Sequence, residues 1–212
     1  MEDGYRMYSR FLSGEEAAHW RGVVEARPEL FRAVGGKGGL NLPFSVVGGR
    51  QVRQHLPDVL DLMKTRLWET AQEAAGRPLA PIQDPERALR IQHYRGKNEG
   101  FRWHYDLSQY SALLTLVNTN GGATEVISPR LSRSLTPLYY LLYPLRQVFS
   151  VARCQRIVSE AGDLLILHGS AALHRATAQQ DQGERLVLVA TFDPVGQRPT
   201  PLRDWVARRF NY

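Results

Sequence analysis

The sequence predicts an α+β fold in which helices come first and short strands then close into a sandwich or jelly roll. Apolar residues recur at helical spacing through much of the first ninety residues. From Ala88 onward the chain instead contains short β-like runs, separated by turn residues such as Asn120-Gly121-Gly122. Helices followed by many short strands are typical of α+β domains with packed or closed sheets.

The helical part begins with a capping signal. Ser13 is followed three residues later by Glu16, and the two side chains can accept hydrogen bonds from exposed N–H groups of a first turn. A second periodic segment follows a Gly/Pro-rich loop over residues 35–49 and covers roughly residues 52–75. Its apolar positions form one stripe on a helix: Leu56, Val59, Leu60, Met63, Leu67 and Ala71.

The later part of the chain contains six runs that predict strands. These are residues 89–94, 111–118, 124–127, 148–152, 163–168 and 186–192. Between them, Thr136-Pro137 predicts the start of a short helix that ends before Pro144. We expect residues 129–147 to form a cover over a site, although packing of its tyrosines on the outside of a sheet would explain the same residues.

The length of 212 residues fits a single domain over residues 1–212. We expect a helical N-terminal part over residues 1–87. A jelly-roll core, which would carry the chemistry, should span residues 88–194. A C-terminal tail or helix over residues 195–212 completes the expected organisation. The composition, 43% hydrophobic and 23% charged, excludes a disordered chain and a collagen-like repeat.

The cysteine content and the apolar runs predict the cellular compartment of the protein. The single cysteine, Cys154, cannot form an internal disulfide, which favours a reducing compartment. The charged start of the chain has no secretory signal, and the longest apolar run, residues 138–143, is too short to span a bilayer. We therefore expect a cytoplasmic protein without a membrane partner.

The chain is basic, with a net charge of +6 and a pI near 9.7. All but three of its 27 basic residues are arginines. They are scattered singly and are not interleaved with aromatic residues, so a solvated basic surface explains them better than a nucleic-acid site. Nucleic acid is therefore not the expected partner.

Three residues have the pattern of a metal site. His104 and Asp106 are two positions apart, so an extended strand would point both side chains to the same side. His174 follows a later predicted strand that begins near Asp163. Two imidazoles and one carboxylate are the ligands of the facial triad of non-haem iron, which leaves the opposite face of the metal open. Any one of these residues alone would be a weak signal.

A fourth residue adds an anion-binding group. Arg185 lies eleven residues beyond His174, at the start of the next predicted strand. A guanidinium buried inside a barrel at that point would bind a carboxylate through two parallel hydrogen bonds. The ordered combination of strand, His-x-Asp, Gly-Gly turn, strand, histidine and arginine is a stronger signal than any of its parts.

With these motifs, the sequence resembles the Fe(II)/2-oxoglutarate-dependent dioxygenases, and in particular the prolyl-4-hydroxylase-type module. The resemblance covers roughly residues 88–194, about half the chain. It is carried by Tyr94, His104-Tyr105-Asp106, Leu116-Val117-Asn118, Gly121-Gly122-Ala123-Thr124-Glu125, Gly162-Asp163-Leu164-Leu165, His174-Arg175-Ala176-Thr177 and Arg185-Leu186-Val187.

The resemblance implies a double-stranded β-helix core, also called a jelly-roll or cupin-like core, with the N-terminal helices packed on one sheet. It implies that His104, Asp106 and His174 ligate Fe(II) and that Arg185 binds the distal carboxylate of 2-oxoglutarate. Tyr94 matches a position where the family often places a hydroxyl against this cosubstrate, although an ordinary strand tyrosine would also fit there. His174 is preferred to His168 because it starts the His-Arg-x-Thr pattern.

The sequence departs from the family at one position. Many members carry Ser or Thr two residues after the arginine, whereas this chain has Val187. A second contact to the cosubstrate must then come from elsewhere, and Tyr94 and Thr115 are the candidates.

The implied reaction uses O₂ and 2-oxoglutarate to hydroxylate an unactivated C–H bond, with release of succinate and CO₂. Related halogenases carry Gly or Ala in place of the ligating carboxylate. The intact Asp106 therefore favours hydroxylation, or a desaturation or ring closure, over halogenation.

The sequence gives less information about the substrate. Mixed arginine and carboxylate groups near the motifs suit a small polar molecule, such as an amino acid or a natural-product intermediate. Candidate substrate residues are Arg102, Trp103, Asn118 and Glu125. The same residues could bind a peptide or protein side chain, and a nucleic-acid demethylase would share the core. A non-catalytic jelly-roll binding module is the other alternative, and a cupin enzyme without 2-oxoglutarate would leave Arg185 without a role.

Overall fold

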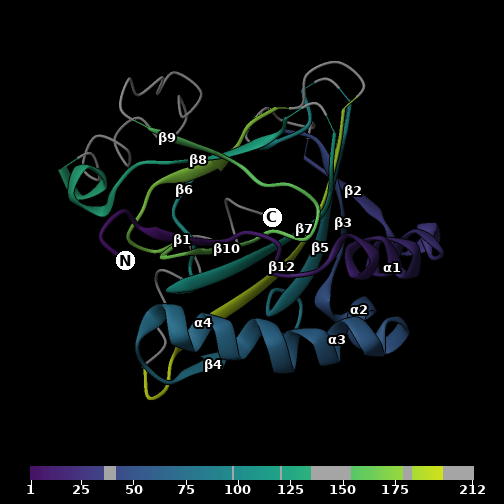
Figure 1. The fold of residues 1–212 in the computed structure, drawn as a ribbon, viewed down its shortest axis with the longest axis horizontal. Coiled ribbons are helices and arrows are strands. Elements are labelled where there is room, and N and C mark those ends of the chain that lie inside the picture. Colours follow the sequence, from purple (N-terminus) through teal and green to yellow (C-terminus); the bar gives the residue numbers. More distant parts are fainter. Residues whose placement is uncertain (36–41, 97, 120, 135–153, 179–182, 198–212) are drawn as a thin grey trace.

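The computed structural model describes residues 1–35, 42–96, 98–119, 121–134, 154–178 and 183–197. In these residues the chain forms two antiparallel sheets with helices on the outer side of the larger one (Figure 1). The predicted strand over residues 148–152, the predicted helix after Thr136 and most of the expected cover over 129–147 lie outside the described residues. Of the expected cover, residues 129–134 are described, and they are helical.

The larger sheet has eight strands in the order β1-β10-β7-β12-β5-β3-β2, and β4 also pairs with β12. Every pairing in it is antiparallel. Its strands are β1 Tyr5–Tyr8, β2 Arg32–Val34, β3 Phe44–Val47, β4 Leu79–Pro81, β5 Leu89–Arg95, β7 Tyr110–Asn118, β10 Leu164–Leu167 and β12 Glu184–Pro194.

The smaller sheet has four strands in the order β6-β11-β8-β9, also antiparallel. They are β6 Phe101–His104, β8 Ala123–Val126, β9 Gln155–Val158 and β11 His174–Ala176. Figure 1 shows this sheet on the opposite side of the large sheet from the long helical segment. The two sheets are the two layers expected of a jelly roll, which confirms the predicted fold class.

The helices cover one face of the large sheet. They are α1 Gly14–Glu25, α2 Gly49–His55, α3 Pro57–Leu62, a π-helical turn over Met63–Leu67 and α4 Trp68–Ala75, with a short 3₁₀ turn over Pro28–Leu30. Their buried residues share one hydrophobic core with alternate residues of β12, among them Leu186 and Leu188. The expectation that the N-terminal helices pack on one sheet is therefore confirmed.

Local chemistry explains the helix boundaries. Ser13 caps α1, and its Oγ accepts from the Glu16 N–H at 3.1 Å while the Glu16 carboxylate accepts from the Ser13 N–H at 2.8 Å. The predicted helix over residues 52–75 is interrupted at Leu56, which adopts a non-helical conformation before Pro57. Gly76 ends α4 with a φ of 64°, a left-handed conformation that favours glycine.

The first ninety residues contain more strand than the sequence predicts. β1, β2, β3 and β4 all lie there and join the large sheet. Each has only three or four residues, too few to show alternation, and β3 falls in a segment interpreted as a Gly/Pro-rich loop. Strand formation here depends on pairing with distant strands, such as β1 with β10. None of the helices in the described part of the chain is long and apolar enough to span a lipid bilayer.

The packing of helices on β12 gives a stability prediction. Leu188 is fully buried in the core between the helices and the large sheet. Leu188→Ala should lower the free energy of unfolding by about 2–5 kcal/mol, because it removes buried methyl groups and leaves a cavity. Urea unfolding measures this change. Val158→Ala on β9 is the control, since Val158 is 48% exposed and its loss should change stability by about 0.5 kcal/mol or less. Equal losses of unfolding free energy in the two variants would contradict the packing of Leu188 between the helices and the large sheet.

Candidate active site

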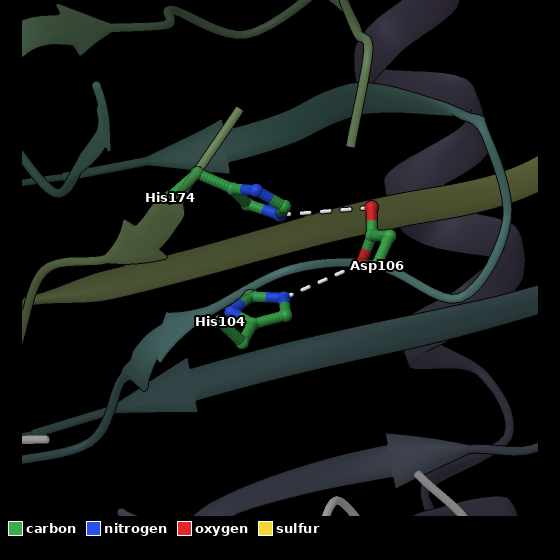
Figure 2. A group of neighbouring side chains, drawn as sticks. All are labelled: His104, Asp106 and His174. Atoms are coloured by element: carbon green, nitrogen blue, oxygen red, sulfur yellow. Dashed lines mark ion pairs between the residues drawn. The ribbon is translucent and has the colours of Figure 1, made fainter. Parts of the chain in front are cut away.

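Three potential metal ligands meet between the two sheets. His104 is the last residue of β6, His174 is the first residue of β11, and the two are directly paired across these antiparallel strands. Asp106 lies two residues beyond the end of β6. Its Oδ1 is 3.3 Å from His104 Nε2 and its Oδ2 is 3.6 Å from His174 Nε2 (Figure 2). One ligand atom from each residue lies within 4.8 Å of the others.

Backbone carbonyls fix the orientation of both imidazoles. His104 Nδ1–H can donate to the Arg102 carbonyl at 2.7 Å, and His174 Nδ1–H to the Ala172 carbonyl at 2.9 Å. This tautomer leaves both Nε2 atoms unprotonated and directed toward Asp106, as metal ligation requires. The Asp106 carboxylate is itself held by the Ser111 hydroxyl, which donates to Oδ2 at 2.6 Å from the large sheet.

The electrostatics keep Asp106 and His174 in their ligating forms. Burial opposes ionisation of Asp106, but His174, His104 and Arg90 outweigh it, and the pKa of the carboxyl lies well below its usual range. Burial lowers the pKa of His174 to about 4, an effect that His104 reinforces and Asp106 opposes. At neutral pH the site therefore offers a carboxylate and a neutral imidazole. This donor set fits a divalent iron ion bound through one face.

A cavity of about 470 Å³ extends from the triad along the inner face of the large sheet. Arg185 lies in its wall and is only 1% exposed. Its Nη1 donates to the Ala123 carbonyl at 3.2 Å and its Nη2 to Thr124 Oγ1 at 2.9 Å, while its Nε has no hydrogen-bond partner among the described residues. Burial lowers the pKa of Arg185, and Tyr94 opposes this effect. No carboxylate among the described residues forms an ion pair with this guanidinium.

The two other predicted cosubstrate residues differ in position. Tyr94 on β5 is directly paired with Arg185 on β12 and lines the cavity, and its hydroxyl donates to Gln92 Oε1 at 3.1 Å. Thr115 on β7 is also buried, and its hydroxyl has no hydrogen-bond partner in the part of the chain that the structure describes. It is not among the residues that line this cavity.

None of the four predicted substrate residues lines the described cavities. Trp103 precedes His104 on β6 and is buried in a separate cluster with Ile127 and Leu173. Arg175 stacks over the Trp103 ring at 4.8 Å and pairs with Glu125 at 2.6 Å, so the carboxylate is already engaged.

The remaining two predicted substrate residues have other surroundings. The Asn118 amide donates to the Gly122 and Ser159 carbonyls, at 2.7 Å each, which fixes it within the protein. Arg102 is buried and contributes its carbonyl to the orientation of His104. None of the four residues contacts the cavity, and their role in substrate binding therefore stays a prediction.

Sequence reasoning missed several cavity residues that alternate along the inner strands. Arg90 and Gln92 share one face of β5 with Tyr94, since alternate residues of a strand point to the same side. The two-residue period at the start of β5, where apolar Leu89 and Ile91 alternate with Arg90 and Gln92, is the signal that could have identified them. The other missed residues are Phe101, Ser111, Leu113, Thr124, Arg175, Ala176, Val187 and Val189.

Comparison with known proteins identifies the fold. No protein-family model and no curated protein matches the chain. Among solved structures, the non-haem α-ketoglutarate-dependent carbocyclase SnoK from nogalamycin biosynthesis matches 98% of this chain and 87% of its own, with a TM-score of 0.69 and 17% identity. The chain has the fold of the non-haem iron and 2-oxoglutarate-dependent oxygenases.

Two further structures with this oxygenase fold are also similar. HygX from Streptomyces hygroscopicus, with nickel and 2-oxoglutarate bound, has a TM-score of 0.70 and 12% identity over 93% of this chain and 85% of its own. A prolyl-4-hydroxylase from Pseudomonas putida has a TM-score of 0.55 and 13% identity over 92% and 94% of the two chains.

The close approach of Gly169 to Asp106 gives a test of the candidate metal site. A Cβ atom on Gly169 would overlap the Asp106 carboxylate, and the Gly169 carbonyl also accepts from the Asp106 N–H at 2.9 Å. Gly169→Ala should therefore displace the carboxylate and weaken divalent-metal binding roughly 10- to 100-fold. Calorimetric titration with Mn(II) measures the affinity.

Gly22→Ala on α1 is the matched control, because a Cβ atom there meets nothing within 4 Å. This variant should bind the metal as the original protein does. Unchanged metal affinity in Gly169→Ala would show that Asp106 does not need its present position to ligate the ion.

Proposed function

We propose that this protein is an Fe(II)- and 2-oxoglutarate-dependent oxygenase that hydroxylates an unactivated C–H bond of a small polar molecule. The observation that carries the proposal is the arrangement of one cavity. It holds His104, Asp106 and His174 together and contains Arg185, a buried guanidinium without a carboxylate partner among the described residues. Iron, O₂ and 2-oxoglutarate would supply the oxidising chemistry, with succinate and CO₂ as products.

The triad residues would hold Fe(II) on one face. The two Nε2 atoms and the Asp106 carboxylate converge on one point, and the Nδ1 hydrogen bonds keep the imidazoles from turning away. Ser111 orients the carboxylate from the large sheet. Three protein ligands on one side leave positions open for the cosubstrate and O₂.

Arg185 would bind the distal carboxylate of 2-oxoglutarate. Its Nη atoms are already oriented by Ala123 and Thr124, so the guanidinium is fixed before a ligand arrives. A carboxylate in this buried place would form strong, charge-assisted hydrogen bonds. Thr124 places a hydroxyl beside Arg185, whereas Val187 is part of the apolar wall. Of the two candidates for a further contact, Tyr94 lines the cavity.

The choice of a small molecule as substrate rests on cavity size and on the neighbours. A cavity of about 470 Å³ suits a ligand of modest size. Structures with this fold include HygX with hygromycin B bound and the epimerase SnoN with nogalamycin RO. We also propose that the protein acts in the cytoplasm, which its single cysteine supports.

Cosubstrate binding under argon tests the proposal. Adding Fe(II) and 2-oxoglutarate should produce the weak visible metal-to-ligand absorption of the complex. A panel of amino acids, peptides, nucleosides and lipids, followed by succinate release in air, then identifies the substrate class. A well-folded protein that gives no absorption would instead be a jelly-roll binding module.

Two substitutions separate the roles of the metal ligand and the cosubstrate ligand. Arg185→Ala removes a partner worth about 2–4 kcal/mol to a buried carboxylate. It should raise the 2-oxoglutarate requirement roughly 30- to 1,000-fold while Fe(II) still binds. Asp106→Ala removes the anionic metal ligand, so both Fe(II) affinity and succinate release should collapse. Arg77→Ala, at an exposed position, is the control. An unchanged 2-oxoglutarate requirement in Arg185→Ala would mean that another basic residue binds the distal carboxylate of 2-oxoglutarate.

A further inference from the structure

A second arginine faces the same cavity from a different place. Arg90 on β5 is paired with Val189 on β12, whereas Tyr94 on the same strand is paired with Arg185. Arg90 and Tyr94 are four residues apart, so their Cα atoms are separated by roughly 13 Å along the strand. Arg90 therefore lies well away from Arg185 along the cavity wall, on the part of it that is closer to Asp106.

The guanidinium of Arg90 is buried, and it forms no ion pair with the part of the chain that the structure describes. The residue is 9% exposed. Nη1 donates to the Arg87 carbonyl at 3.1 Å, and the buried Nε has no hydrogen-bond partner within the described ranges. No carboxylate of the described residues forms an ion pair with it. Arg87 differs, because its Nε lies 3.2 Å from Asp84 Oδ2 and its charge is compensated.

Arg90 also borders a second hollow beside the triad. This hollow, of about 380 Å³, does not include Arg185; the residues that it shares with the first cavity are Arg90, Phe101, His104 and Asp106. Its remaining wall includes Tyr105 and Ser108. A molecule in this hollow would contact the potential metal ligands without contacting Arg185, so a substrate would have room there while 2-oxoglutarate occupies the first cavity.

Charge balance specifies the group that Arg90 would bind. In the complex of the proposed function, Fe(II) and Arg185 supply as much positive charge as Asp106 and the two carboxylates of 2-oxoglutarate supply negative charge. The charge of Arg90 is then left without compensation. An isolated buried charge is costly and is normally paired in a protein. One further negative charge balances it, and a guanidinium binds a carboxylate through two parallel hydrogen bonds.

We propose that Arg90 is a substrate-binding residue that selects molecules carrying a carboxylate. This inference rests on the proposed function and narrows its substrate class from small polar molecules to small carboxylic acids. Arg90 fixes the acid group beside the metal site, so the carbon to be oxidised belongs to the part of the molecule that reaches the triad.

Paired probes test the inference in the complex with Fe(II) and 2-oxoglutarate under argon. Acetate is compared with acetamide and benzoate with benzamide, at matched ionic strength, and phenyl phosphate is included to distinguish a carboxylate site from a general anion site. The change in the visible absorption and the rise in thermal midpoint report binding. The carboxylates should bind about tenfold or more tightly than their amides.

Variants of Arg90 test whether the preference for carboxylates over amides depends on this residue. Arg90→Gln should abolish the preference for acids while leaving the affinities for Fe(II) and 2-oxoglutarate within about twofold of the original. Arg90→Lys keeps the charge and should retain a weaker preference, which covers the case in which Arg90→Gln does not fold. Arg77→Gln, at an exposed position, is the control and should behave as the original protein.

Several results would overturn the inference. An equal affinity for acids and amides in the original protein would do so, as would an acid preference that survives in Arg90→Gln. Tighter binding of phenyl phosphate than of benzoate would assign the site to phosphate. A loss of 2-oxoglutarate affinity in Arg90→Gln as large as in Arg185→Ala would make Arg90 a cosubstrate ligand.

The inference and the proposed function fail in different ways. If the original protein gives no absorption with Fe(II) and 2-oxoglutarate, the proposed function is wrong, and the substrate assignment built on it is also wrong. If this complex forms normally and the acid preference does not depend on Arg90, only the inference is wrong.

Discussion

The structure depends most on the two-residue alternation of side chains along β12. This strand lies between β7 and β5 in the large sheet. Leu186, Leu188 and Ala190 point into the core shared with the helices. Arg185, Val187 and Val189 point the other way and line the cavity. One strand therefore supports the hydrophobic core and the candidate site together, and a shift of register by one residue would exchange the two faces.

Much of the fold and the centre of the site could be predicted from the sequence. The long inner strands, β5, β7 and β12, carry enough alternating residues to be recognised locally. His104 and Asp106 are close in sequence, and His174 and Arg185 follow at the spacing of a known family. The four short strands in the first ninety residues could not be predicted in this way, because they are defined by partners far along the chain, such as Leu167 for Tyr5.

The predicted substrate residues show a different limit of sequence reasoning. Trp103 and Glu125 are near the motifs in sequence, yet the structure engages them through Arg175, which stacks on one and pairs with the other. The polarity of a residue did not show whether its partner was a ligand or another part of the chain. Arg90 is the opposite case, because its proposed role appears only when it is known that no carboxylate of the described residues pairs with it.

The burial of Arg185 has a thermodynamic consequence for the whole protein. A buried cation without a counter-ion among the described residues makes the ligand-free chain less stable than its packing alone would allow. A dicarboxylate that binds only the folded state raises stability by RT ln(1 + [L]/Kd), about 2.7 kcal/mol when its concentration is 100 times Kd. In the proposed oxygenase, a higher concentration of 2-oxoglutarate would therefore raise the stability of the folded protein as well as its rate of turnover.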